Sequence, residues 1–264
     1  MNIFIRELKA NFRSLLIWSV IVLLFVTVGF SKFSAYADNP ELLAVLDGMP
    51  PALLNAFNLN AFNLTTVTGF FGVMIAYFSV LLTVAAVMWG SDIITKEERD
   101  KTVEFSLTLP VRRETLVTAK TLAALVNCVG LLLVTWAATL VSATRYQPDG
   151  DYYAFVARGM LAMFIMMMIF LAVGIFLGCA MKRHKAAGSV AVSVLLGTYF
   201  LSFVTDLNHD LEFLRYFTPF KYFNPVALLH DAKYDATFVL LSAGIIVVCL
   251  IGAYITYAKR DLYI

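Results

Sequence analysis

Six stretches of the sequence, each at least 18 residues long, contain no charged side chain. They cover residues 14–31, 52–91, 121–144, 159–181, 186–205 and 236–258. A helix that crosses a membrane needs about 20 such residues, because each residue advances the helix by about 1.5 Å and the hydrocarbon core is about 30 Å thick. The sequence therefore predicts a protein built within a lipid bilayer.

Little of the chain remains outside these stretches. Hydrophobic residues make up 61% of the 264 residues and charged residues 14%, against about 45–50% and 25% in soluble domains. A nucleotide-binding domain, a hydrolase core or a receptor ectodomain would not fit in the remainder. We predict one all-α membrane domain over residues 1–264, with six spans at about 14–33, 69–91, 116–143, 157–181, 186–205 and 236–258.

The basic residues between the spans are distributed unevenly. The six spans leave seven segments outside them, counting the two terminal tails. Fourteen Lys and Arg lie in or beside the first, third, fifth and seventh of these segments, and six lie in the other three. The larger set is Arg6, Lys9, Arg13, Lys96, Arg99, Lys101, Arg112, Arg113, Lys120, Lys182, Arg183, Lys185, Lys259 and Arg260. Short loops rich in Lys and Arg remain in the cytoplasm. We therefore expect both termini to be cytoplasmic.

Three segments outside the spans have their own patterns. Residues 1–13 alternate apolar and charged side chains at helical spacing, which predicts an amphipathic helix at the membrane interface. Residues 34–66 form a long outer loop, whose asparagines favour helices on the membrane surface over a span. Residues 206–235 are rich in aromatic residues and contain Pro219 and Pro225, which predicts short re-entrant or interfacial helices.

The most informative polar segment connects the second and third spans, at residues 91–113. Acidic and basic side chains alternate from Asp92 to Glu104, and an apolar stripe of Phe105, Leu107 and Leu109 follows. Pro110 ends the helix, because the residue before a proline is pushed out of the helical region. Such a compact element, with a charged face and an apolar face, is suited to docking in a groove of another protein.

This segment resembles the permease subunit of ABC-2-type transporters. The family pattern has Glu-Glu, then Gly-Thr, then Glu, and then a Leu-rich run that closes in Pro-(Val/Ile)-x-Arg. The matching residues are Glu97, Glu98, Thr102, Glu104, Leu107, Leu109, Pro110, Val111 and Arg113. Lys101 stands where the family has glycine. The order of spans and loops along the whole chain is similar to the family as well.

The resemblance implies a bacterial export permease in the cytoplasmic membrane, in which residues 91–113 contain a coupling helix. Two permease copies, as a homodimer or a heterodimer, would each dock on a separate cytosolic ABC ATPase, and the ATPases would bind ATP and magnesium. The expected ATPase-coupling residues are Glu97, Glu98, Arg99, Thr102, Glu104, Leu107, Pro110 and Arg113. A second, smaller candidate contact is Lys182, Arg183 and Lys185, although a simple topology anchor is the favoured interpretation of this loop.

Other kinds of function have weaker support. The sequence contains no Walker motif, and no catalytic, cofactor-binding or metal-binding pattern, so we expect neither an enzyme nor a nucleic-acid-binding protein. Uncharged spans favour an amphipathic or hydrophobic cargo such as a drug, a peptide antibiotic or a lipid-like molecule. A sensor or assembly component that contacts an ATPase without moving cargo remains an alternative, and an intramembrane lipid-modifying enzyme is a weaker one.

One small-residue motif concerns packing. Gly174 and Gly178 form a G-x-x-x-G pair, which lets two helices approach closely. The pair is expected either inside one protomer or at a dimer seam.

Overall fold

The computed structural model describes residues 3–37, 48, 50, 62–100, 112–181, 183–207 and 209–259. Six helices in these ranges are long and apolar enough to cross a membrane, which confirms the predicted number of spans. They are α1 (Ile3–Tyr36), α4 (Val67–Arg99), α6 (Arg113–Ala143), α7 (Gly150–Ala180), α8 (His184–Leu207) and α10 (Ala236–Lys259). Their bounds enclose five of the six predicted spans, and the fourth, 157–181, ends one residue after α7. The described ranges contain no strand.

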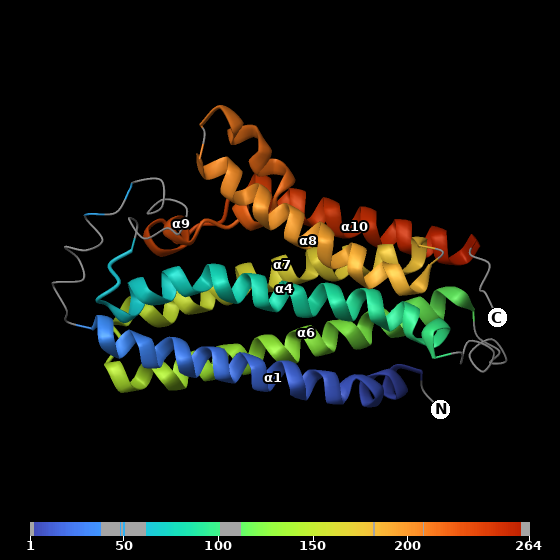
Figure 1. The fold of residues 1–264 in the computed structure, drawn as a ribbon, viewed down its shortest axis with the longest axis horizontal. Coiled ribbons are helices and arrows are strands. Elements are labelled where there is room, and N and C mark those ends of the chain that lie inside the picture. Colours follow the sequence, from blue (N-terminus) through green and yellow to red (C-terminus); the bar gives the residue numbers. More distant parts are fainter. Residues whose placement is uncertain are drawn as a thin grey trace.

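The six helices form one elongated bundle (Figure 1). Helix α4 packs along α7, α1 packs along α6, and α10 and α8 cover the α7 and α4 side of this four-helix layer. Both chain termini lie at the same end of the bundle, together with the end of α4 and the start of α6. We call this the termini end and the opposite end the far end.

Within the described ranges, four short helices lie toward the far end. They are η2 (Thr144–Tyr146), η3 (His209–Phe217), η4 (Pro219–Lys221) and α9 (Pro225–His230). Proline occupies the first position of both η4 and α9, where its missing N–H is harmless and its fixed φ suits a helix start. The expected break-up of this region into short helices is confirmed. A re-entrant or interfacial position for them stays a prediction.

Helices α4 and α7 approach so closely that glycine is required on both. A Cβ atom on Gly90 would lie 2.5 Å from the carbonyl oxygen of Leu171, and one on Gly174 would lie 2.5 Å from that of Val87. Gly178 lies against Ser91 in the same crossing. The G-x-x-x-G pair of α7 therefore packs inside the protomer, against a glycine of α4.

Helix α1 differs from the expected separate amphipathic helix followed by a span. Residues 3–13 form the first turns of one continuous 34-residue helix, because no Gly or Pro interrupts the sequence before Gly29. At about 1.5 Å per residue, α1 is longer than the hydrocarbon core is thick, so a straight crossing leaves part of it outside the core. Their interfacial position stays a prediction.

The surface helices expected in residues 34–66 fall mostly outside the described residues. The continuous described part before α4 begins at Phe62, which is buried beside the first turns of α4. Thr66 then caps α4, since its side-chain oxygen accepts a hydrogen bond from the backbone N–H of Gly69 at 3.1 Å.

Candidate functional site

The predicted coupling segment lies between the last turn of α4 and the first turn of α6, at the termini end. Residues 101–111 lie outside the described residues, and with them Thr102, Glu104, Leu107 and Pro110. The structure does describe both attachments of the segment, which are residues 96–100 and Arg112–Arg113.

Glu97, in the last turn of α4, faces the interior of the bundle. Its Oε1 accepts a hydrogen bond from Nη2 of Arg6 at 3.0 Å, and its Oε2 lies 3.2 Å from Nζ of Lys120. These partners belong to α1 and α6, so one carboxylate joins the ends of three helices. Only 8% of Glu97 is exposed.

Lys120 is the most deeply buried cation of this group, with 1% of the residue exposed. Besides its ion pair with Glu97, its Nζ donates a hydrogen bond to the backbone carbonyl of Ile93 in α4, at 2.8 Å. This carbonyl is one turn before Glu97, so Lys120 holds α6 against two successive turns of α4.

A second ion pair completes the group. Nζ of Lys96 contacts the carboxylate of Glu7, which is 1% exposed, and Nη2 of Arg6 lies 3.4 Å from the same carboxylate. We call Arg6, Glu7, Lys96, Glu97 and Lys120 the charge cluster. Buried charges of this kind are tolerated only when each has a partner, because removing them from water costs several kcal/mol per ion. The cluster therefore fixes the relative positions of the α1, α4 and α6 ends.

The outer side of the same α4 turn is more exposed to solvent. Arg99 is half-exposed and pairs with Asp92, two turns earlier in α4, and with Asp100, whose Oδ1 lies 3.1 Å from the Nε of Arg99. Glu98 is partly exposed. Cations in the last turn, here Lys96 and Arg99, also interact favourably with the negative end of the helix dipole.

The other attachment is joined to the end of α10. Nη1 of Arg113 donates hydrogen bonds to the backbone carbonyls of Tyr257 at 3.4 Å and Ala258 at 3.3 Å. The last carbonyls of a helix have no partner within it, and an arginine can satisfy them. One turn further along α6, Thr118 and Tyr254 share a hydrogen bond of 2.8 Å between their hydroxyl groups.

The expected secondary contact lies at the same end. Arg183 is exposed between α7 and α8, and its backbone carbonyl accepts a hydrogen bond from the N–H of Ala186 at 3.0 Å. Lys182 lies outside the described residues, and Lys185 belongs to the first turn of α8.

Of the predicted coupling residues, the structure places Glu97, Glu98 and Arg99 together on α4 and Arg113 at the start of α6. It gives Glu97 a role within the bundle that the sequence did not indicate. The contact of these four residues with an ATPase stays a prediction. Sequence reasoning did not place Arg6, Glu7, Lys96 or Lys120 in a cluster with Glu97. The available signal was that Lys120 lies directly beside the uncharged stretch that starts at Thr121.

The sequence profile of the ABC-2 family transporter protein family matches residues 1–262. The chain belongs to this family. It is therefore the membrane permease component of an ABC-2 transporter, a multi-pass subunit without an ATPase domain, and such permeases generally pair with an ABC ATPase. A comparison with curated proteins found no match.

Proposed function

We propose that this ABC-2 permease exports an amphipathic or hydrophobic cargo, driven by two copies of a separate cytosolic ATPase. The segment from Glu98 to Arg113 would dock on the ATPase, and a second permease copy would complete the transport path. ATP and magnesium would bind to the ATPase subunits. The uncharged spans support a drug, a peptide antibiotic or a lipid-like molecule over a small ion.

The charge cluster is the observation that carries this proposal. ATP can favour one permease conformation only through contacts that differ between the two states. A force on the coupling segment would act first on the α4 end, which Glu97 joins to α1 and α6, and on the α6 start, which Arg113 joins to α10. The two attachments of the segment are therefore joined to four of the six long helices, α1, α4, α6 and α10. Movement of the segment can be transmitted to these helices.

The same proposal places the termini end in the cytoplasm of a bacterial cell. The support is the distribution of basic residues, since the connecting segments at the termini end hold more Lys and Arg than those at the far end. In this orientation the coupling segment and the Arg183 loop both face the ATPase, and the short helices η3, η4 and α9 face the outer leaflet.

The test uses the permease co-expressed with its partner ABC ATPase. We expect Glu98→Lys combined with Glu104→Lys to abolish capture of the ATPase while the permease still inserts in the membrane. Arg145→Glu, a charge reversal at the far end, serves as the control and should capture the ATPase normally. Full capture and full transport by the double variant would refute the docking role.

The sensor or assembly alternative makes a different prediction for the reconstituted complex. A transporter hydrolyses ATP faster when its cargo is present and accumulates that cargo in vesicles. A sensor would show a change in ATPase rate with no movement of any amphipathic compound across the vesicle membrane. Measuring both quantities in the same vesicles separates the two functions.

A further inference from the structure

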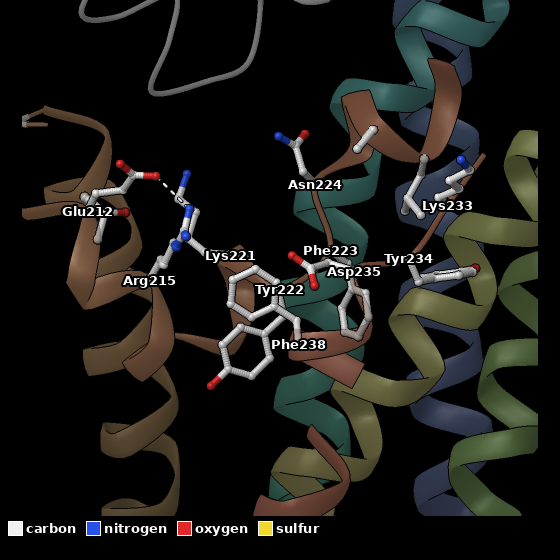
Figure 2. Close-up of a pocket in the computed structure, with 13 residues that line it drawn as sticks. Glu212, Arg215, Lys221, Tyr222, Phe223, Asn224, Lys233, Tyr234, Asp235 and Phe238 are labelled. Carbon is white, nitrogen blue, oxygen red and sulfur yellow. Dashed lines mark hydrogen bonds and ion pairs between the residues drawn. The ribbon is translucent and has the colours of Figure 1, made fainter. Parts of the chain in front are cut away.

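A pocket of about 340 Å³ lies at the far end, where η3, η4 and α9 meet the start of α10. Figure 2 shows its lining, with the Glu212–Arg215 pair on one side and Lys233 and Tyr234 on the other. This volume is at the lower end of the range for small-molecule sites, which is about 300–1,000 Å³. The pocket lies at the opposite end of the bundle from the charge cluster, so the proposed coupling to an ATPase does not explain it.

The floor of the pocket is aromatic and buried. The rings of Tyr222 and Phe238 stack with centroids 5.1 Å apart and an interplanar angle of 15°, and Phe223 is buried beside them. Burial raises the pKa of Tyr222 to about 12, so its hydroxyl stays protonated and donates to the carbonyl of Tyr216 at 2.6 Å. The floor therefore offers ring surface to a ligand, with its polar atoms already satisfied.

The walls carry charges of both signs. Arg215 donates a hydrogen bond to Glu212 at 2.6 Å, and its positive charge also interacts with the carboxylate of Asp235. Asp235 accepts a hydrogen bond from the backbone N–H of Thr237 at 2.8 Å, which caps α10 through one oxygen and leaves the other oxygen for a ligand. Lys233 is exposed and forms no ion pair with any residue that the structure describes. The lining of the pocket thus includes the ammonium group of Lys233, which has no ion-pair partner among the described residues, and the carboxylate of Asp235.

The backbone before Lys233 has an unusual conformation. Ala232 has a φ of 53°, in the left-handed region that a residue with a Cβ rarely adopts. Such strain persists only where the surrounding structure enforces it, and it is often found at binding sites. Here it turns the chain between α9 and α10, so that Lys233, Tyr234 and Asp235 all line the pocket.

Large apolar side chains are exposed on the elements that form the pocket. Phe213 and Phe217 of η3 are 58% and 66% exposed, and Leu240 of α10 is 72% exposed. Exposed aromatic residues close to cationic ones are typical of the membrane–water interface. A ligand in this pocket would therefore have its polar part among charges and its apolar part beside lipid-facing side chains.

We propose that the pocket binds the headgroup of a phospholipid that carries both a phosphate and a primary amine. Lys233, with Lys221 from the opposite wall, pairs with the phosphate, and Asp235 accepts hydrogen bonds from the ammonium group above the Tyr222 and Phe238 rings. A purely anionic headgroup would leave Asp235 facing a second negative charge, and a quaternary amine could not donate to it. The acyl chains lie outside the pocket, along Phe213 and Leu240.

The test measures binding of short-chain phospholipids to the purified full-length permease in detergent, by the shift in thermal unfolding as lipid is titrated. The probes are phosphatidylethanolamine, phosphatidylcholine and phosphatidylglycerol with identical acyl chains. We expect phosphatidylethanolamine to bind about tenfold more tightly than the other two, which is the effect of one charge-assisted hydrogen bond. Equal affinity for all three lipids would overturn the proposal.

Two variants and one control locate the site. Asp235→Asn keeps the helix cap but removes the charge, so it should abolish the preference for the primary amine. Lys233→Gln should weaken binding of all three lipids by about tenfold. Lys32→Gln, an exposed cation of α1 at the same end, should bind as the wild type does. Wild-type behaviour of both pocket variants would overturn the proposal.

Soluble compounds distinguish a lipid from a free phosphate. Glycerophosphoethanolamine has the same headgroup without acyl chains, and inorganic phosphate has the anion alone. We expect both to compete poorly with the lipid, because they lack the contact with Phe213 and its apolar neighbours. Competition as strong as that of the lipid itself would reject a lipid occupant. The proposal needs no ATPase, so its outcome is independent of the transport test.

Discussion

Lys120 and Glu97 form an ion pair of 3.2 Å between α6 and α4, at a depth where neither side chain has appreciable contact with solvent. Removing either partner would leave the other charge buried with less compensation. Lys120 also bonds to the carbonyl of Ile93, and Glu97 also bonds to Arg6 of α1. The pair is therefore the centre of the charge cluster and links the α4 attachment of the coupling segment to α6.

Replacing Lys120 by methionine should destabilise the permease. The variant leaves Glu97 buried with one partner fewer, and breaking a buried ion pair by removing one partner costs about 3–5 kcal/mol. We expect the lower end of this range, since Arg6 still pairs with Glu97. Thermal unfolding of the purified protein in detergent measures the change.

The double variant Lys120→Met with Glu97→Gln tests whether the loss comes from the uncompensated charge. It should recover a large part of the stability that Lys120→Met alone loses. Arg215→Gln removes one partner of an exposed pair with Glu212 and should change stability little, because exposed pairs contribute little. A double variant that is as unstable as the sum of the two single variants would contradict the coupling of the pair.

Gly174→Ala should destabilise the protein although alanine is the better helix former. The added Cβ would lie 2.5 Å from the carbonyl oxygen of Val87, so α7 must move away from α4. Overpacking of this kind costs about 1–3 kcal/mol. Gly244→Ala in α10 is the matched control, because no atom lies within 4 Å of its added Cβ. We expect thermal unfolding to show a loss only for Gly174→Ala.

The number and placement of the spans followed from the sequence, because a bilayer admits few solutions for an uncharged run of 20 residues. The extension of α4 to Arg99 and of α1 back to Ile3 did not. Charges such as Glu7 and Lys96 suggest the end of a span when each is considered alone. Their pairing across two helices keeps both in helical structure at the interior of the bundle, and no single-segment pattern reveals such a pairing.

The candidate site was predictable only in part. The acidic pair Glu97–Glu98 is one motif in the sequence, but in the structure the first side chain faces the bundle and the second is partly exposed. Neighbouring residues on a helix point about 100° apart, so they cannot both serve the same surface. The partner that decides which one turns inward, Lys120, lies 23 positions further along the chain and is set by tertiary packing.

The two acidic residues of the motif should therefore have separable effects on transport. Glu98→Lys should weaken capture of the ATPase, since it reverses a charge on the proposed docking surface. Glu97→Gln should retain capture but lower the amount of cargo moved per ATP hydrolysed several-fold, because the link to α1 and α6 is weakened. Both quantities are measured in reconstituted vesicles. Loss of ATPase capture by Glu97→Gln, with its fold intact, would contradict this division of roles.

Arg113→Gln should loosen the end of α10. The variant shortens the side chain that reaches the carbonyls of Tyr257 and Ala258, and these carbonyls then lose a charged partner. We expect faster hydrogen–deuterium exchange in residues 254–259 and little change in the middle of α10. Arg112→Gln, at the neighbouring exposed position, is the control and should leave exchange unchanged. Equal exchange in both variants would show that Arg113 does not stabilise this end.

The orientation of the bundle can be tested with two exposed arginines at opposite ends. Arg183 lies at the termini end and Arg145 at the far end. Each is replaced by cysteine in a chain that lacks the native Cys128, Cys179 and Cys249. A charged maleimide cannot cross a membrane, so with intact cells it should label Arg145→Cys and leave Arg183→Cys unlabelled until the cells are permeabilised. The reverse pattern would place the coupling segment outside the cell, where no ATP-driven partner could reach it.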